Sequence, residues 1–287
     1  MRILVTGATG FIGNHLITEL LKQGHKVIAT SSSVKKASEY DWFKKVRFIE
    51  YKITQDATDL NLFEFFESPE QVIHLAWEGL PNYNALHHIE VNLFAQYNFL
   101  KNLITHGLKK LLITGTCLEY GLQNGCLYED TPAYPSNPYA IAKDTLRKFI
   151  EIIKGQFDLN LTWVRLFYMY GNGQAGSSLI SQLDQAIIKK EASFNMSLGE
   201  QIRDFLPVET VAGYIAKISQ QSTYSGIINC CSGQPVSVRK FVENYLKEKG
   251  ATIQLNLGFY KYPQYEPLAF WGDNTKLNKI LADDIQG

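Results

Sequence analysis

A glycine-rich turn near the start of the chain constrains the fold more than any other feature. Gly7, Gly10 and Gly13 follow an apolar run at residues 2–6 and open a helical pattern over residues 11–22. The first glycine permits a tight turn, the second lets the backbone approach a diphosphate, and the third allows close helix–strand packing. The N–H groups at such a helix start favour an anion. The turn predicts a strand–helix–strand unit that binds a dinucleotide, although glycines here could also serve the turn alone.

Strand and helix patterns alternate beyond this unit. Apolar runs are separated by stretches with helical spacing, and Pro138 is placed to begin a long helix. This alternation predicts an α/β fold, a Rossmann-like doubly wound parallel sheet. The pattern weakens after Tyr170, so we expect a dinucleotide-binding domain at residues 1–166, with residues 206–231 returning to it, and a smaller substrate-binding cap at residues 167–287. The strands expected in the sheet are residues 2–6, 26–30, 46–51, 71–76, 109–115 and 161–167.

Charge and cysteine content limit the partners. Lys and Arg total 28 and Asp and Glu total 28, which argues against a nucleic-acid binder because such proteins need uncompensated cations. The chain shows no apolar run long enough to span a bilayer and no leader pattern at its first residues. None of the four cysteines lies in a C-x-x-C motif, so we expect no metal site, reduced thiols and a cytoplasmic protein without a membrane partner.

The loop after the second strand bears on the cofactor. Ser31, Ser32 and Lys35 lie there, and the first carboxylate is Glu39. A site that prefers NAD usually has an acid at this point to bind the adenosine ribose, whereas hydroxyls and lysines can bind a 2′-phosphate. The loop favours NADP(H), with NAD(H) as the alternative, unless it is only a solvated polar turn.

A tyrosine and a lysine are spaced for proton transfer. Tyr139 and Lys143 lie four residues apart, on one face of the expected helix. We expect the nearby ammonium to lower the pKa of the phenol, which could then exchange a proton with a sugar oxygen. Thr116 ends the fifth strand, where its hydroxyl could meet the same oxygen.

With these motifs in place, the sequence resembles an extended short-chain dehydrogenase/reductase, in the branch that acts on nucleotide sugars. The matching segments run along nearly the whole chain. They are TGATGFIG at 6–13, VIHLA at 72–76, VN at 91–92, GTCLEYG at 115–121, YAIAK at 139–143, VRLFYMYG at 164–171, RDFLPVETVA at 203–212 and INCCSGQPVSV at 228–238.

The resemblance implies roles for particular residues. It assigns the catalytic hydroxyl to Thr116, the acid/base to Tyr139 and its electrostatic partner to Lys143. Substrate contacts fall on Thr116, Tyr139, Tyr168 and Arg203, with Arg203 on a phosphate unless it pairs with an acid such as Asp204. Trp77, which follows VIHLA, is expected either to line the sugar site or to be only a lid or core residue. Cofactor contacts fall on Gly7, Gly10, Phe11, Ile12, Gly13, Ser31, Ser32, Lys35, Leu75, Ala76, Tyr139, Lys143 and Phe167.

Departures from the family patterns narrow the reaction. The dehydratases carry Asp and Glu after the catalytic threonine, where this chain has Cys117 and Leu118. The combined epimerase-reductases carry a cysteine and a histidine where this chain has Leu118 and Gly173. Tyr168 replaces an asparagine common in 4-epimerases. We therefore expect NADPH-dependent reduction of a dTDP-4-keto-6-deoxyhexose for cell-surface sugar synthesis. The alternatives are an NAD-dependent 4-epimerase and a dinucleotide-binding protein without turnover.

Three histidines and two helices complete the expectations. His74 lies in a buried strand and is expected to be a core residue, while His87 and His88 are expected on the surface or a dimer face. By the same resemblance, the helices at 86–105 and 139–154 pair into a homodimer interface.

Overall fold

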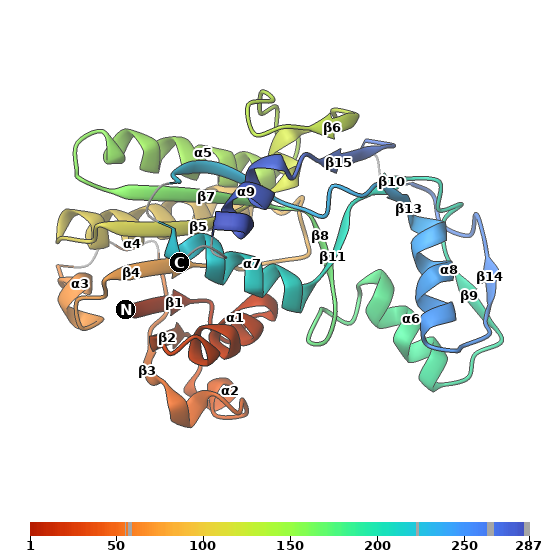
Figure 1. Cartoon of the computed structure of the whole chain (residues 1–287), viewed down its shortest axis with the longest axis horizontal. Coiled ribbons are helices and arrows are strands. Elements are labelled where there is room, and N and C mark those ends of the chain that lie inside the picture. Colours follow the sequence, from red (N-terminus) through yellow and green to blue (C-terminus); the bar gives the residue numbers. More distant parts are fainter. Residues whose placement is uncertain (55, 57–58, 222–223, 263–266, 284–287) are drawn as a thin grey trace.

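The computed structural model describes residues 1–54, 56, 59–221, 224–262 and 267–283. Seven parallel strands form one sheet in the order β12-β7-β5-β4-β1-β2-β3 (Figure 1). The chain runs outward from β1 to β3, crosses to β4 and continues to β12, so the strand order reverses beside β1. This confirms the predicted doubly wound sheet. The strands are β1 (Arg2–Thr6), β2 (Lys26–Ser31), β3 (Arg47–Glu50), β4 (Gln71–His74), β5 (Lys110–Thr116), β7 (Asn160–Leu166) and β12 (Gly226–Cys230).

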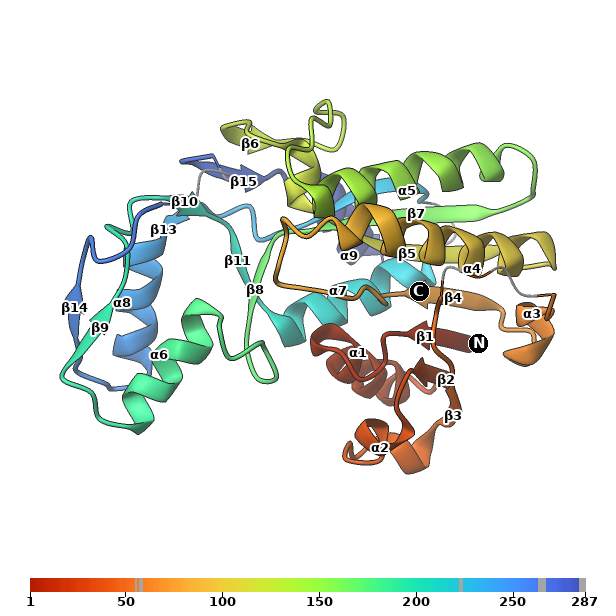
Figure 2. The same cartoon turned by 180° about the vertical axis from the view of Figure 1, so that it is seen from behind.

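Helices cover both faces of this sheet, as Figures 1 and 2 show from opposite sides. In β1, Ile3 and Val5 pack toward one face and Leu4 toward the other, so alternate side chains belong to separate cores. The first face carries α1 (Phe11–Lys22), α7 (Val208–Gln220) and α9 (Thr275–Asp283), and the second carries α3 (Leu62–Phe65), α4 (Leu93–Thr105) and α5 (Pro138–Lys154).

A smaller lobe lies beyond the carboxyl ends of the strands (Figure 1). Ile180, Leu183, Phe194 and Val242 belong to its own apolar core. The paired strands β8 and β11 lead from the sheet into this lobe. Its elements and connecting strands are β8 (Tyr168–Tyr170), α6 (Leu179–Ile188), β9 (Ser193–Asn195), β10 (Ile202–Arg203), β11 (Phe205–Pro207), β13 (Val236–Ser237), α8 (Val238–Glu248) and β14 (Gln254–Asn256).

The helix α5 begins where the sequence predicts. The Asn137 side chain accepts a hydrogen bond from Ala140 N at 2.9 Å, and Pro138 occupies the first turn. Tyr139 therefore lies at the start of α5, facing the ends of the strands, and Lys143 follows one turn later.

Several short elements are absent from the sequence-based expectations. These are α2 (Val34–Ala37), the 3₁₀ turns at Phe43–Lys45 and Cys117–Tyr120, and β6 (Gly125–Leu127) paired with β15 (Phe270–Gly272). The helix expected at 86–105 starts with a π-helical turn at His88–Asn92 and continues as α4. Near the end of the described chain, β15 and α9 form although no strand or helix was expected there. The predicted boundary between two domains stays a prediction. Among the described helices, none combines the length and apolar character needed to cross a membrane.

Candidate active site

The glycine turn has the geometry that a bound diphosphate requires. Gly7 has φ +66°, and a Cβ there would lie 2.9 Å from the backbone N of Ala76. A Cβ on Gly13 would overlap the carbonyl oxygen of Gly7, so both positions need glycine. Gly10 caps α1 without a side chain, which leaves the first N–H groups of the helix open to an anion.

A cleft of about 830 Å³ extends from this turn to the smaller lobe. Most of the residues that the sequence singles out line this cleft, from the glycine turn through the ends of the strands to the smaller lobe. The expected residues that line it are Gly7, Gly10, Phe11, Ile12, Gly13, Leu75, Trp77, Thr116, Tyr139, Lys143, Phe167, Tyr168 and Arg203.

Four expected cofactor contacts lie outside the lining, as far as the described residues show: Ser31, Ser32, Lys35 and Ala76. Lys36, the next residue along, lines the cleft instead of Lys35. The reason is the short helix α2, which Ser33 caps by accepting from Lys36 N at 3.2 Å. No spacing rule distinguishes adjacent lysines in a loop.

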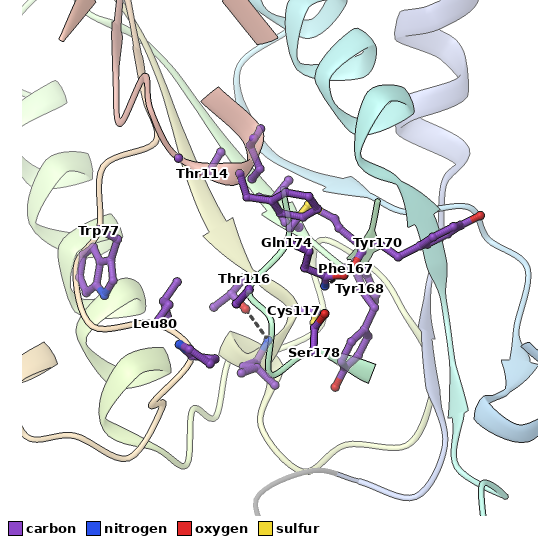
Figure 3. A pocket seen from close by; sticks show the side chains of 18 of the residues that line it. Trp77, Leu80, Thr114, Thr116, Cys117, Phe167, Tyr168, Tyr170, Gln174 and Ser178 are labelled. Carbon is purple, nitrogen blue, oxygen red and sulfur yellow. Dashed lines mark hydrogen bonds between the residues drawn. The ribbon is translucent and has the colours of Figure 1, made fainter. Parts of the chain in front are cut away.

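Thr116, Tyr139 and Lys143 come together at the end of β5. The Lys143 Nζ donates to the carbonyl oxygen of Thr114 at 2.8 Å, and Tyr139 lies within hydrogen-bonding reach of the Thr116 side chain. All three side chains are buried. The Thr116 hydroxyl also accepts from Leu118 N at 3.3 Å, the contact drawn as a dashed line in Figure 3.

The protonation of this group differs from the sequence-based expectation. Burial raises the pKa of Tyr139, and the nearby Tyr83 and Glu119 raise it further, so the phenol is protonated at neutral pH. The expectation of a lowered pKa for Tyr139 was wrong, because burial of the phenol itself is the largest influence on this pKa. Burial lowers the pKa of Lys143 to about 7, against a smaller effect of Glu119.

A buried network of hydrogen bonds and one ion pair holds the backbone of Thr116 through Glu119. Glu119 accepts the backbone N–H of Thr116 at 2.9 Å and the indole N–H of Trp163 at 3.0 Å. It also pairs with Arg165 at 2.8 Å, with both side chains almost fully buried. The guanidinium of Arg165 lies over the Tyr120 ring.

Aromatic and apolar side chains form the wall beside Tyr139. The Trp77 and Tyr83 rings lie 5.9 and 5.5 Å from the Tyr139 ring, centroid to centroid. Figure 3 shows Trp77 and Leu80 on one side of the pocket, with Tyr168 and Tyr170 on the other. Trp77 is therefore a lining residue, one of the two roles left open by the sequence.

His74 lies in the core as predicted, whereas the prediction for His88 was wrong. His74 is buried, as predicted, with Nδ1 2.9 Å from the Thr6 hydroxyl. Burial lowers the pKa of His74 to about 3, so it is neutral. His88 was expected on the surface or a dimer face and is instead fully buried, because the loop after β4 folds back over it.

Arg203 lies on the side of the cleft that faces the smaller lobe. Its Nη1 donates to the carbonyl oxygens of Ile202 and Leu268, and its guanidinium lies 4.7 Å from the centroid of Phe270. Asp204 accepts from the backbone N–H groups of Ser232 and Gly233 instead. The cleft-facing place of Arg203 is compatible with a phosphate contact, which stays a prediction.

Sequence reasoning missed part of the lining, both in the segments that follow β4 and β5 and in the smaller lobe and its loops. These residues belong to short strands and turns whose positions depend on distant contacts, so no local pattern identifies them. They include Leu80, Pro81, Tyr83, Cys117, Leu118, Gln174, Ser177, Ser178, Gln201 and Phe205. Cys117 is buried and also lines the cleft.

Comparison with known proteins agrees with this geometry. The family model described as "NAD dependent epimerase/dehydratase family" matches residues 3–231. The chain is 30% identical over 275 residues to a dTDP-6-deoxy-L-talose 4-dehydrogenase (NAD(+)) of Aggregatibacter actinomycetemcomitans, covering 95% of this chain and 99% of the relative. It is 25% identical over 292 residues to a GDP-6-deoxy-D-talose 4-dehydrogenase of the same organism, covering 100% and 93%.

Solved structures match over the same extent. A UDP-glucuronic acid 4-epimerase from Bacillus cereus, in complex with UDP-glucuronic acid and NAD, superposes with a TM-score of 0.85 at 22% identity. The match covers 98% of this chain and 93% of that one. The family match over most of the chain, together with the sheet and its glycine turn, shows that this chain belongs to the NAD dependent epimerase/dehydratase family and is an oxidoreductase or isomerase.

Proposed function

We propose that this enzyme reduces the 4-keto group of a dTDP-4-keto-6-deoxyhexose and catalyses the reverse oxidation. The observation that carries the proposal is the meeting of Thr116, Tyr139 and Lys143 in a buried site where the phenol is protonated. A protonated phenol is the form that a ketone reduction needs, because the new alkoxide must receive a proton. The relative named as a dTDP-6-deoxy-L-talose 4-dehydrogenase supports the same chemistry.

The residues divide the reaction between them. A bound nicotinamide supplies the hydride that adds to C4 of the sugar. Tyr139 gives its proton to the C4 oxygen, so the carbonyl becomes a hydroxyl and the phenol becomes a phenolate. Thr116 holds the same oxygen by a hydrogen bond, and the Lys143 ammonium stabilises the phenolate. Solvent then returns a proton to Tyr139.

The wall beside Tyr139 favours a 6-deoxy sugar. Trp77, Leu80, Pro81 and Leu118 line the cleft there and offer apolar surface. A C6 methyl group suits such a surface, whereas a C6 carboxylate would lose hydration without a charged partner.

For the cofactor, we propose NAD(H) in place of the NADP(H) that the sequence favours. Glu50 at the end of β3 accepts from Val34 N at 2.9 Å, which holds a carboxylate next to the loop after β2. This carboxylate would repel a 2′-phosphate and can accept from a ribose hydroxyl. Lys36 lines the cleft and suits the shared diphosphate. The NAD named with the relative and the solved epimerase supports this preference.

A 4-epimerase is the second candidate. The 0.85 TM-score match to a 4-epimerase favours it, since the fold of both lobes is shared. The two activities differ in cofactor balance: a reductase consumes one NADH for each sugar, and an epimerase returns its cofactor unchanged. A protein that only binds dinucleotide would show neither.

The proposal is tested by mixing the enzyme with NADH and a dTDP-4-keto-6-deoxyhexose and following nicotinamide fluorescence. We expect turnover by the wild type and a loss of about 10²- to 10⁴-fold in Tyr139→Phe, with NADH binding retained. Interconversion of 4-hydroxy epimers without NADH loss would favour the epimerase, and activity unaffected by Tyr139→Phe would overturn the assignment of the proton donor.

We also propose a homodimer through α4 and α5. Phe94, Ile141 and Ile152 on these helices are exposed, the last at 66%. Light scattering should give twice the chain mass for the wild type and a monomer for Phe94→Glu combined with Ile152→Glu. A monomeric wild type would contradict the dimer.

A further inference from the structure

His88 is buried against the wall of the proposed sugar site. It belongs to the π-helical turn that precedes α4, and none of its surface is exposed. Its ring lies 6.2 Å from the Trp77 ring and 5.3 Å from the Tyr139 ring, centroid to centroid. Neither the proton transfer nor the cofactor contacts described above use this histidine.

The hydrogen bonds of His88 fix its tautomer. The Trp77 indole N–H can only donate, and it lies 3.1 Å from Nδ1 of His88. The Asn92 amide nitrogen lies 3.2 Å from the same Nδ1. The other ring nitrogen, Nε2, lies 2.8 Å from the carbonyl oxygen of Asn82, which can only accept. His88 is therefore neutral, with its proton on Nε2, and its unprotonated Nδ1 holds the indole.

The indole in turn contacts the Tyr139–Lys143 pair. The Lys143 Nζ lies 4.3 Å from the centroid of the Trp77 ring, a distance at which the ring face attracts an ammonium. The Trp77 and Tyr139 rings meet edge to face, with an interplanar angle of 74°. The orientation of the Trp77 indole therefore affects the positions of both Lys143 and Tyr139. His88 accepts the hydrogen bond from the indole N–H.

We propose that His88 is a positioning residue that acts through Trp77: by accepting the indole N–H, it holds the ring against Lys143 and Tyr139 and so keeps the pair aligned for proton transfer. The proposal rests on the 4-keto reductase function given above. It does not place His88 in contact with substrate or cofactor.

A double-mutant cycle tests the coupling between the two residues. His88→Leu removes the acceptor, and Trp77→Phe keeps an aromatic ring but removes the N–H. Each single variant should lower kcat for keto reduction about tenfold, the order expected when a hydrogen bond to a buried group is lost. The double variant should be no slower than the slower single variant, because both changes remove the same contact. Independent effects that multiply to about a hundredfold would overturn the proposal.

Two further variants separate positioning from folding. His88→Asn places an acceptor oxygen near the position of Nδ1, so it should recover most of the lost kcat. His87→Asn makes the same change at the neighbouring residue, whose ring contacts His88 but does not bond the Trp77 N–H, and should leave kcat within about twofold. If His88→Asn is as slow as His88→Leu while both melt at the wild-type temperature, the hydrogen bond to Trp77 does not affect kcat and the proposal is overturned.

A measurement on the protein without substrate tests the hydrogen bonding of His88 independently of catalysis. Long-range ¹H–¹⁵N NMR of the His88 ring should show a proton on Nε2 and none on Nδ1 at neutral pH. A proton on Nδ1 would overturn the proposal, whatever the enzyme catalyses. If the tautomer is as expected but no 4-keto sugar is reduced, the proposed function fails and the role of His88 in it fails as well.

Discussion

The Glu119 carboxylate accepts the backbone N–H of Thr116 at 2.9 Å and forms an ion pair with Arg165 at 2.8 Å. The carboxylate therefore links the end of β5 to the neighbouring strand β7. Both partners are almost completely buried, so neither charge can be hydrated if the other is removed.

This relationship predicts a large loss of stability on breaking the pair. Glu119→Leu leaves Arg165 charged and buried, and should lower the free energy of unfolding by about 3–5 kcal/mol. Glu119→Gln should lose less, because its amide oxygen can still accept the Thr116 N–H. Urea denaturation of the three proteins checks the order. If Glu119→Leu is as stable as the wild type, the pair contributes nothing.

The glycine turn predicts a selective effect on cofactor binding. Gly7→Ala forces a Cβ to within 2.9 Å of the Ala76 backbone N at φ +66°, so the phosphate-binding turn must shift. Gly24→Ala is a matched control, since its φ is +78° but nothing lies near its Cβ. Both should lose about 1 kcal/mol of stability from backbone strain, and Gly7→Ala should lose more because its Cβ also meets backbone atoms. Calorimetry should show weakened NADH binding in Gly7→Ala alone; equal affinities in the two variants would contradict the proposed place of the diphosphate.

The buried lysine predicts a dependence of stability on pH. The pKa of Lys143 falls from 10.5 to about 7 on folding, because burial disfavours the ammonium. Between pH 7 and 10.5 the unfolded chain thus carries the extra proton, and stability should rise with pH by about 1.4 kcal/mol per unit. Lys143→Met removes this contribution.

The test compares wild type and Lys143→Met without cofactor at several pH values. The variant should be the more stable protein at pH 7, and its advantage should shrink toward pH 10.5. A constant difference across this range would mean that the pKa of Lys143 is not lowered by burial.

Cofactor preference predicts a role for Glu50. The wild type should use NADH with a higher kcat/KM than NADPH. Glu50→Gln should narrow that ratio by about tenfold, the effect of removing one like charge beside a phosphate. Glu39→Gln, which removes an exposed acid from the segment between α2 and β3, should leave the ratio unchanged. A wild type that prefers NADPH would contradict the proposed NAD(H) preference and support the NADP(H) preference inferred from Ser31, Ser32 and Lys35.

Features set by local sequence were predicted, and features set by distant packing were not. The turn from Gly7 to Gly13 and the start of α5 at Pro138 follow from short-range backbone chemistry, and both lie where they were expected. The surroundings of His88 did not follow, because they depend on a loop folding back over its ring.

The same distinction explains the error on Tyr139. Its spacing to Lys143 is local, but its pKa depends on how deeply the surrounding elements bury it. The choice between Lys35 and Lys36 likewise depends on α2, a helix of four residues that no periodic pattern reveals.

The central claim is that hydride moves between the nicotinamide and C4 of the sugar, with Tyr139 supplying the proton. The most direct measurement is NMR of the sugar formed from a dTDP-4-keto-6-deoxyhexose and NADH deuterated at its transferable position. We predict one deuterium at C4 for each NADH oxidised, and incorporation slowed by about 10²- to 10⁴-fold in Tyr139→Phe. Deuterium at another carbon, or sugar conversion without net oxidation of NADH, would contradict the account.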